Sequence, residues 1–183
     1  MNFKPITFDF NIHTDLLQLT LTPCDGEKFL VSNRPGDITL QCPHRKLSAS
    51  GDLQLWMRKV IRELLREQAK MIFPARLKQL SFRSGLVYNK LSIHKTSSKW
   101  GSFSSKKNIN LSLYLMLLDS RYVDYTMLHE LCHSREMNHG PRFWALLNSF
   151  LGGEARQQSR EMAHIVKEWY ETGDPRALLI SNH

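Results

Sequence analysis

The sequence predicts an α+β protein in which antiparallel strands precede a long helix, and further strands precede a group of C-terminal helices. Three observations predict this class. Stretches that alternate apolar and polar residues fill residues 5–43, apolar residues spaced three or four apart run through 53–72, and alternation returns over 86–116 before helical spacing resumes. A period of two is typical of half-buried strands, whereas spacing of three and four gathers apolar side chains on one face of a helix.

The N-terminal region is expected to form an antiparallel meander or a pair of hairpins. Its alternating stretches are ITFDFNI, LLQLTLT, KFLVS and ITLQC, and turn-rich pieces such as PCDGE and NRPGD separate them. The basic piece PHRKLSASGD then leads to the change of period.

A long amphipathic helix is expected to begin at Asp52, a residue type that often caps a helix N-terminus. Its basic face is interpreted as solvated, with a groove for nucleic acid as the less favoured alternative. Pro74 is expected to interrupt or kink the pattern, and ARLKQL to add another turn or two. The apolar positions are Leu53, Trp56, Met57, Val60, Ile61, Leu64, Leu65, Ala69 and Ile72, and the basic ones are Arg58, Lys59, Arg62, Arg66 and Lys70.

The second half of the chain returns to strands and then to helices. The expected strands are LVYNKLSI, KWGSFSS and NINLSLYL, joined by turns at KTSSK and SKKN. Helices are expected over 121–137, about 141–151 and about 155–171. The tail GDPRALLISNH is expected to end loosely on the surface.

The run HELCHSREMNHGPRFW, residues 129–144, has the residue types of a metal site. His129 and His133 are four residues apart, and at about 3.6 residues per turn a helix brings both imidazoles within reach of one cation. Glu130 can then contact a water molecule at the metal without being a ligand. This is the HExxH pattern of zinc metallohydrolases, in which zinc lowers the pKa of water to about 7 and the glutamate accepts its proton. An amphipathic helix with surface histidines is the simpler alternative, but the flanking residues are apolar, and histidines buried there without partners would be costly.

A third protein ligand is needed if one position on zinc is to stay open for water. His139 follows His133 by six residues, and NHGP favours a turn followed by a new helix, so that His139 can return to the metal. Glu154 and Glu161 on the next helix are the alternatives. We favour His139 because it lies at a turn beside the motif.

The spacing HExxH-x5-H equals that of the metzincins, but Glu136 stands where those enzymes have a glycine. This difference leaves the exact backbone path after the motif undecided. His139 is still expected to reach the metal. Glu136 is interpreted as an acid that supports the ligands or as a surface charge, and Cys132 as core packing.

A longer segment resembles a known family. It reads KWGSFSSKKNINLSLYLMLLDSRYVDYTMLHELCHSREMNHGPRFWALL. It is similar to the YgjP-like, WLM- and SprT-related family of zincin-type metallopeptidases, whose members have a tryptophan-glycine-serine segment, an asparagine-rich strand, and HELxH followed by NH and FW. The resemblance is close over about residues 95–150 and looser over the preceding strands and long helix. Phe103 departs from it, because many relatives have the cysteine of WGSCS there, but that cysteine is not a ligand in the family pattern.

The resemblance implies zinc ligands at His129, His133 and His139 and a catalytic base at Glu130. It also implies a zincin-like fold, in which a mixed sheet packs on the active-site helix and an edge strand lies along the cleft. NINLSLYL is expected to be that edge strand, to which a substrate peptide could add through main-chain hydrogen bonds.

Other residues near the motif receive less specific interpretations. Trp100 and Trp144 could line the cleft, although ordinary core packing is favoured for both. The candidates for stabilising an oxyanion are Tyr125, Asn138 and Arg142.

Length and composition favour one domain. The chain has 183 residues, of which 42% are apolar and 23% charged, and it contains no internal repeat, low-complexity tract or linker. We expect a single domain over 1–183, with an N-terminal strand region at about 1–50 and a catalytic core at about 51–172.

Charge and cysteine content limit the partners and the compartment. The net charge of +8 favours acidic partners such as nucleotides or nucleic acids, but a solvated basic surface explains it equally well. The cysteines Cys24, Cys42 and Cys132 form no CxxC pair, so they are interpreted as reduced thiols of a cytoplasmic protein. MNFKPITFDF lacks a signal-peptide pattern and the longest apolar run, LYLMLL, is too short to cross a bilayer. The sequence gives no indication of oligomeric state.

The leading hypothesis is a zinc-dependent metallopeptidase that acts on a peptide or protein, with Glu130 activating water. Fold and ligands alone do not fix the group that is attacked. A metal-dependent nucleoside triphosphate pyrophosphohydrolase is one alternative, favoured by the net charge and by the upstream lysines Lys95, Lys99, Lys106 and Lys107. A DNA-associated protease is another, favoured by the basic helix and opposed by the lack of a cysteine ribbon. A non-catalytic binding module is opposed by Glu130 beside the histidines.

Overall fold

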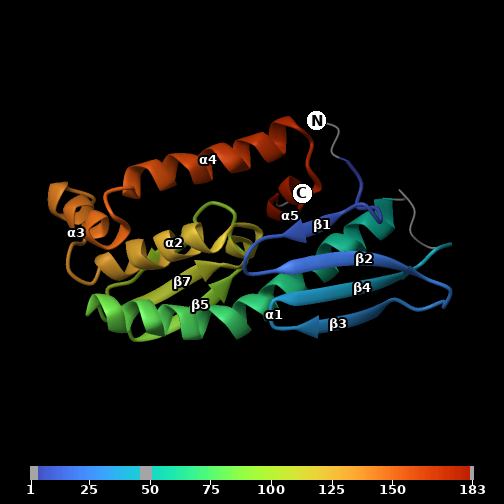
Figure 1. Cartoon of the computed structure of the whole chain (residues 1–183), viewed down its shortest axis with the longest axis horizontal. Helices are drawn as coiled ribbons and strands as arrows, with labels where there is room; N and C mark the ends of the chain where they lie inside the picture. The colour runs from blue at the N-terminus through green and yellow to red at the C-terminus, as the bar shows by residue number, and fades with distance from the viewer. Residues whose placement is uncertain (1–3, 46–50, 182–183) are drawn as a thin grey trace.

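Two small sheets and a set of helices form an α+β fold in a computed structural model that describes residues 4–45 and 51–181 (Figure 1). The expected class is therefore confirmed. Residues 46–50, where the strand region and the catalytic core were expected to meet, lie outside the described residues. The elements are β1 (Asn11–His13), β2 (Gln18–Cys24), β3 (Leu30–Arg34), β4 (Asp37–Pro43), α1 (Gly51–Ser84), β5 (Lys90–His94), β6 (Gly101–Phe103), β7 (Asn108–Ser112), the 3-10 helix η1 (Leu113–Leu117), α2 (Ser120–Cys132), α3 (Pro141–Leu151), α4 (Ala155–Glu171) and α5 (Pro175–Ile180).

The N-terminal sheet has the strand order β1-β2-β4-β3. β1 pairs antiparallel with β2 and β3 pairs antiparallel with β4, which confirms the pair of hairpins. The two hairpins meet through a parallel pairing of β2 with β4, in which Leu19 faces Ile38 and Leu21 faces Leu40. A purely antiparallel arrangement is thus wrong. The parallel register places these four apolar side chains, each at most 5% exposed, on one buried face.

The long helix α1 runs without interruption through Pro74 to Ser84, so the expected break at Pro74 is wrong. Pro74 lies on the exposed side of the helix. Asp52 lies inside the first turn and is not the N-cap, because the helix already includes Gly51. The buried face is apolar over most of its length and comprises Met57, Ile61, Leu65, Ala69, Phe73 and Leu77.

The basic face of α1 was expected to be solvated. This expectation is wrong for Arg62, which is only 8% exposed. Its Nε donates to the carbonyl oxygen of Leu179 at 2.9 Å, and its NH2 donates to those of Leu178 at 3.0 Å and Ser181 at 3.2 Å. These carbonyls belong to the C-terminal end of α5, whose Ala177–Ile180 stretch is buried. The tail is therefore an ordered helix bound to α1, and the expectation of a loose surface tail is wrong.

The second sheet has the order β5-β7-β6, with β7 parallel to β5 and antiparallel to β6. The expected edge strand NINLSLYL is therefore wrong on two counts: NINLS forms the central strand and LYL begins η1. The Asn110 side chain of β7 shows this central position, since its Nδ2 donates to Ser102 Oγ at 3.1 Å and its Oδ1 pairs with His94 Nε2 at 3.1 Å. β6 is an edge of the sheet.

Figure 1 shows α1 accompanying both sheets along most of the molecule, while α4 lies along the opposite side. One hydrophobic core extends from Ile6 to Ile180 and includes buried residues of both sheets. Polar contacts also join α1 to the N-terminal region, since Gln54 accepts a hydrogen bond from Ile6 N at 2.8 Å and Gln68 accepts one from Gly36 N at 2.8 Å. No helix within the described ranges is long and apolar enough to span a membrane.

Candidate metal centre

The helix α2 carries the first two candidate ligands at its C-terminal end. It begins at Ser120 and ends at Cys132, five residues before the expected end at 137. His133 is the C-cap and keeps helical backbone angles, with φ −64° and ψ −13°. The four-residue spacing therefore retains its geometric effect, and the ring centroids of His129 and His133 lie 5.2 Å apart.

The third histidine returns to the first two through the turn at residues 133–140. Glu136 N donates to Cys132 O at 2.9 Å, Gly140 N donates to Asn138 O at 2.7 Å, and α3 starts at Pro141. This path places His139 Nε2 2.9 Å from His129 Nε2. One candidate ligand atom from each of His129, His133 and His139 lies within 4.8 Å of the other two. The structure thus brings together the three histidines that the sequence predicted as ligands.

A backbone contact orients the imidazole of His133, and a side-chain contact holds the main chain of His139. His133 Nδ1 lies 3.0 Å from the carbonyl oxygen of Glu136, so Nδ1 carries the proton and Nε2 is free to bind a metal. Trp144 Nε1 donates to the carbonyl oxygen of His139 at 3.0 Å and so holds the turn against α3. Phe143 is fully buried, and its ring centroid lies 4.7–4.8 Å from those of all three histidines. The contribution of Glu136 to the site is its backbone carbonyl oxygen, which accepts a hydrogen bond from His133 Nδ1.

Burial favours the neutral form of these imidazoles. It lowers the pKa of His129 to about 3, with a further lowering from His133 and His139, and it also lowers the pKa of His133. A neutral imidazole is the form that binds a metal ion. Among the described residues His129 Nδ1 is buried without a hydrogen-bond partner. With Zn–N bonds of about 2.0–2.1 Å, tetrahedral ligand nitrogens lie about 3.3 Å apart, so a cluster within 4.8 Å fits one ion.

Glu130 lies against the edge strand β6 and is only 5% exposed. Burial raises the pKa of its carboxyl group to about 7, and the positive charge of Lys99 opposes this shift. Gly101 leaves the space for this carboxylate, since a Cβ atom there would lie 2.7 Å from Glu130 Oε1. The WGS segment of the family pattern marks Gly101 in the sequence. It does not indicate that Gly101 contacts Glu130.

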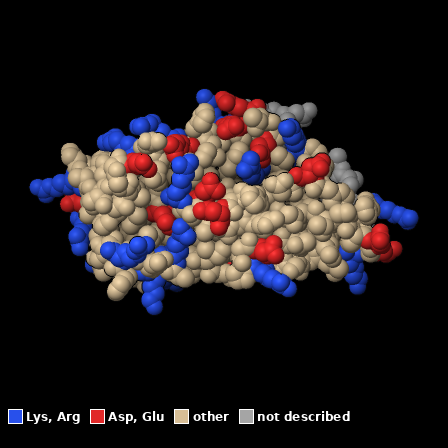
Figure 2. Space-filling view, in the orientation of Figure 1, with Lys and Arg blue, Asp and Glu red and all other residues tan. Residues whose placement is uncertain are grey.

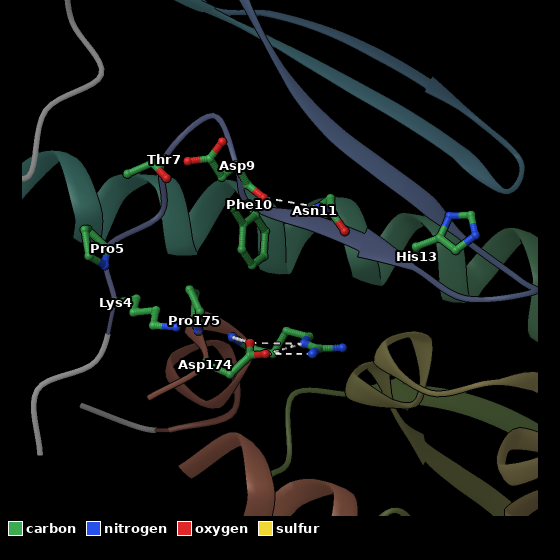
Figure 3. A pocket seen from close by; sticks show the side chains of 10 residues that line it. Lys4, Pro5, Thr7, Asp9, Phe10, Asn11, His13, Asp174 and Pro175 are labelled. Carbon is green, nitrogen blue, oxygen red and sulfur yellow. Dashed lines mark hydrogen bonds and ion pairs between the residues drawn. The ribbon is translucent and has the colours of Figure 1, made fainter. Parts of the chain in front are cut away.

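A cavity of about 340 Å³ opens beside His129 and Glu130, between β6, α2 and α4. A slightly larger cavity of about 380 Å³ lies elsewhere, between the N-terminal segment and α5. Figure 3 shows Phe10, Asn11 and His13 on one side of that second cavity, with Asp174 and Pro175 opposite. None of its described lining residues belongs to the histidine cluster, so of these two cavities the smaller one adjoins the candidate ligands.

A family model described as "YgjP-like, metallopeptidase domain" matches residues 11–165, which is most of the chain. The chain belongs to the YgjP-like metallopeptidase family. No curated protein and no solved structure matches it. Membership in a YgjP-like metallopeptidase family and the three-histidine cluster together indicate a metal-dependent hydrolase.

The alternative third ligands lie outside the cluster of this YgjP-like chain. Glu161 accepts a hydrogen bond from the Tyr122 hydroxyl at 3.0 Å and forms an ion pair with Arg121. Glu154 is exposed at the start of α4, and the described residues that could hold a metal together do not include it.

Three aromatic residues that the sequence indicated as candidates lie at or beside the site. Trp100 and Tyr125 line the 340 Å³ cavity, and Trp144 contacts the His139 loop. Each tryptophan also packs against the hydrophobic core, which confirms the favoured core packing, and Trp100 lines the cavity as well. Of the other oxyanion candidates, Asn138 and Arg142 are both exposed.

The upstream lysines are solvated. Lys95, Lys99, Lys106 and Lys107 are all exposed, and only Lys99 acts on the pKa of Glu130. Figure 2 shows lysine and arginine side chains spread over the visible face with acidic side chains between them. The basic charge therefore has the distribution of an ordinary solvated surface on this face.

Proposed function

We propose that this YgjP-like protein is a zinc-dependent metallopeptidase. His129, His133 and His139 are the zinc ligands, and Glu130 is the general base. The observation that carries the proposal is the gathering of three imidazole ligand atoms within 4.8 Å, next to a buried carboxylate on the same cavity wall. Three protein ligands leave one position of a tetrahedral zinc ion open, as catalytic zinc sites do.

Zinc fits the donor set better than magnesium or calcium. Imidazole nitrogens suit zinc and its transition-metal neighbours, whereas magnesium and calcium prefer oxygen ligands. Bound zinc would polarise the substrate carbonyl and make a water molecule more acidic. Glu130 accepts a proton from the attacking water and passes it to the leaving amine. Its burial keeps the carboxyl pKa near neutrality, which suits a group that must both accept and donate a proton.

The edge strand β6 is the proposed backbone-binding element for a peptide, in place of β7. It pairs with β7 on one side only among the described strands. Its Gly101 lies beside Glu130, so a peptide added along this edge would run past the general base. We further propose that the fold is zincin-like and that residues 1–183 form one domain, which the continuous hydrophobic core supports.

Hydrolysis of a nucleoside triphosphate on the same site is the second candidate. The observation that favours it is the closeness of Lys99 to Glu130, because a lysine beside the metal could bind a phosphate group. No lysine or arginine is among the described residues that line the cavity, which favours the peptidase. A DNA-associated protease remains a prediction from sequence, supported by the basic long helix and by the resemblance to SprT- and WLM-related proteins.

The test begins with the metal. Elemental analysis should find about one zinc ion per chain, and the His129→Ala/His133→Ala variant should lose it. His13→Ala/His164→Ala is the matched control, because both of these histidines are exposed and lie outside the cluster, and it should retain the metal. Retention of zinc by the first variant would exclude the site.

The second step separates the reactions. Unfolded protein substrates and nucleoside triphosphates are assayed side by side with wild type and Glu130→Gln. A peptidase should cleave only the former, and Glu130→Gln should lower the rate by about 10²–10⁴-fold while keeping the zinc. If the protein cleaves nucleoside triphosphates in a reaction that depends on Glu130 and cleaves no protein, the peptidase is excluded and the nucleoside triphosphate hydrolase takes its place. DNA binding with a steep salt dependence would support the third possibility.

A further inference from the structure

The cavity beside Glu130 is placed to receive part of a substrate. Its volume of about 340 Å³ lies at the lower end of the range for ligand pockets, about 300–1,000 Å³. His129 and Glu130 form one wall, and residues of α4 form the opposite wall. A group that enters this cavity therefore lies next to the proposed reacting atoms.

The cavity has few free polar groups. Met162 is 2% exposed and, with Ala163 and Trp100, contributes an apolar surface. The Thr126 hydroxyl donates to the carbonyl oxygen of Tyr122 at 2.9 Å, inside its own helix. Burial raises the pKa of the Tyr125 hydroxyl, and Ser159 lies close enough to that hydroxyl to oppose the shift. The Thr126 hydroxyl is thus already paired, and among the described residues that line the cavity the buried polar atom without a partner, His129 Nδ1, belongs to the proposed reaction centre.

Glu130 is the only acidic or basic side chain, other than the imidazole of His129, among the described residues that line this cavity. An acidic substrate side chain would be placed beside the Glu130 carboxylate, and a lysine or arginine would find no acidic partner in the described lining other than Glu130, the group that has to accept the proton of the water. An apolar side chain brings no polar group of its own that would need a partner in this lining. The lining therefore discriminates by charge.

We propose that this cavity is a substrate subsite that takes an uncharged, apolar side chain next to the cleaved bond, and that Ala163 sets its size. Ser159 and Ala163 are four residues apart on α4, so they share one face, and both are exposed at the mouth of the cavity. A large side chain at position 163 would fill the space that a leucine or phenylalanine of the substrate needs. The inference rests on the proposed peptidase function and names its substrate class.

The test uses a series of glycine-flanked peptides that differ at one residue, which is alanine, leucine, phenylalanine, aspartate or lysine. Wild type should cleave next to leucine or phenylalanine, with kcat/KM at least about tenfold above alanine and about a hundredfold above aspartate. Ala163→Trp should lower the leucine-to-alanine ratio of kcat/KM by about tenfold or more. Ala75→Trp is the matched control, because Ala75 is an exposed alanine of α1 outside the cavity, and it should keep the wild-type ratio.

A binding measurement gives a readout that does not need turnover. In protein with ¹³C-labelled methionine methyl groups, N-acetyl-leucinamide should shift the Met162 signal, identified through Met162→Leu, and N-acetyl-aspartamide should not. Met71 is the internal control, because it is exposed on α1 and does not line the cavity. A Met162 signal that does not respond to the leucine compound would contradict the subsite.

The outcomes separate this inference from the function on which it rests. If wild type cleaves no peptide in the series and no unfolded protein, both the peptidase and the subsite are excluded. If it cleaves with dependence on zinc and Glu130 but shows no preference for apolar residues, or if Ala163→Trp leaves the ratio unchanged, only the subsite is excluded. Should Ala163→Trp fail to fold, Ser159→Leu at the same mouth carries the same expectation.

Discussion

Gly101 lies in direct contact with Glu130: a Cβ atom at Gly101 would lie 2.7 Å from Oε1 and 2.8 Å from Cγ of the glutamate. Gly101 is the first residue of β6, and Glu130 is in the last turn of α2. No left-handed backbone angle requires glycine at this position. The missing side chain is required because the edge strand approaches the helix so closely that only a hydrogen atom fits between them.

Gly101→Ala should therefore move the general base. The new methyl group would force the Glu130 carboxylate away by several tenths of an ångström, and a misplacement of about 1 Å can cost about 10²-fold in rate. We expect kcat/KM to fall about 10- to 100-fold while the zinc content stays unchanged. Gly26→Ala is the control, because nothing lies within 4 Å of a Cβ atom at that position. Activity within twofold of wild type would show that the contact is relaxed in solution.

Trp144→Phe should weaken metal binding without removing a ligand. The indole Nε1 donates to the carbonyl oxygen of His139 at 3.0 Å and fixes the turn that presents this histidine. Loss of such a supporting contact lowers metal affinity by about 10- to 100-fold, which competition with a chelator would measure. Trp56→Phe should have no effect, because Trp56 contacts Phe29 in another part of the molecule. Equal affinities for the two variants would refute the positioning role of Trp144.

Arg62→Met should lower the free energy of unfolding by about 2–4 kcal/mol, because a buried charged donor that serves three carbonyl oxygens is removed. Urea denaturation at neutral pH would measure the change. Lys59→Met, on the exposed side of the same helix, should change it by less than about 0.5 kcal/mol. A loss below about 1 kcal/mol for Arg62→Met would mean that the α5 contact contributes little.

The buried thiols should resist alkylation in the folded protein. Burial raises the pKa of Cys42 to about 11 and that of Cys132 to about 12. The thiolate is the reactive form, so at pH 8 only about one Cys42 in 10³ is reactive, and protection should persist until the pH nears these values. Cys24 is partly exposed. Mass spectrometry after iodoacetamide treatment at pH 8 should find one adduct on the folded chain and three in urea; three adducts without urea would contradict the buried core.

The gathering of the three histidines was predictable because it depends on residues that are close together in the chain. Helical spacing alone brings His129 and His133 together. His139 returns to them through a turn that the residues NHGP favour. The bounds of α3 and α4 followed from the same kind of pattern and are confirmed at 141–151 and 155–171. Each of these predictions depends on residues close together in the chain.

The errors share a different origin. NINLSLYL has the alternation of any half-buried strand, and nothing in it states that β6 pairs with its other side and makes it central. The tail looked loose because PRALLI is too short for a helical period to be recognised, and its partner Arg62 lies more than 110 residues earlier. Such pairings are chosen by burial and hydrogen bonding across the whole fold.

The sequence by itself determined the α+β class, the family and the set of three histidines and one glutamate for which we propose the chemistry, because residue type and short spacing encode them. Tertiary structure alone decided that Gly101 packs against Glu130 and that Met162 and Ala163 face the general base across one cavity. Those contacts join β6, α2 and α4, which are distant in the chain. They exist only because one core packs these elements together, and no local pattern specifies which distant side chains will meet.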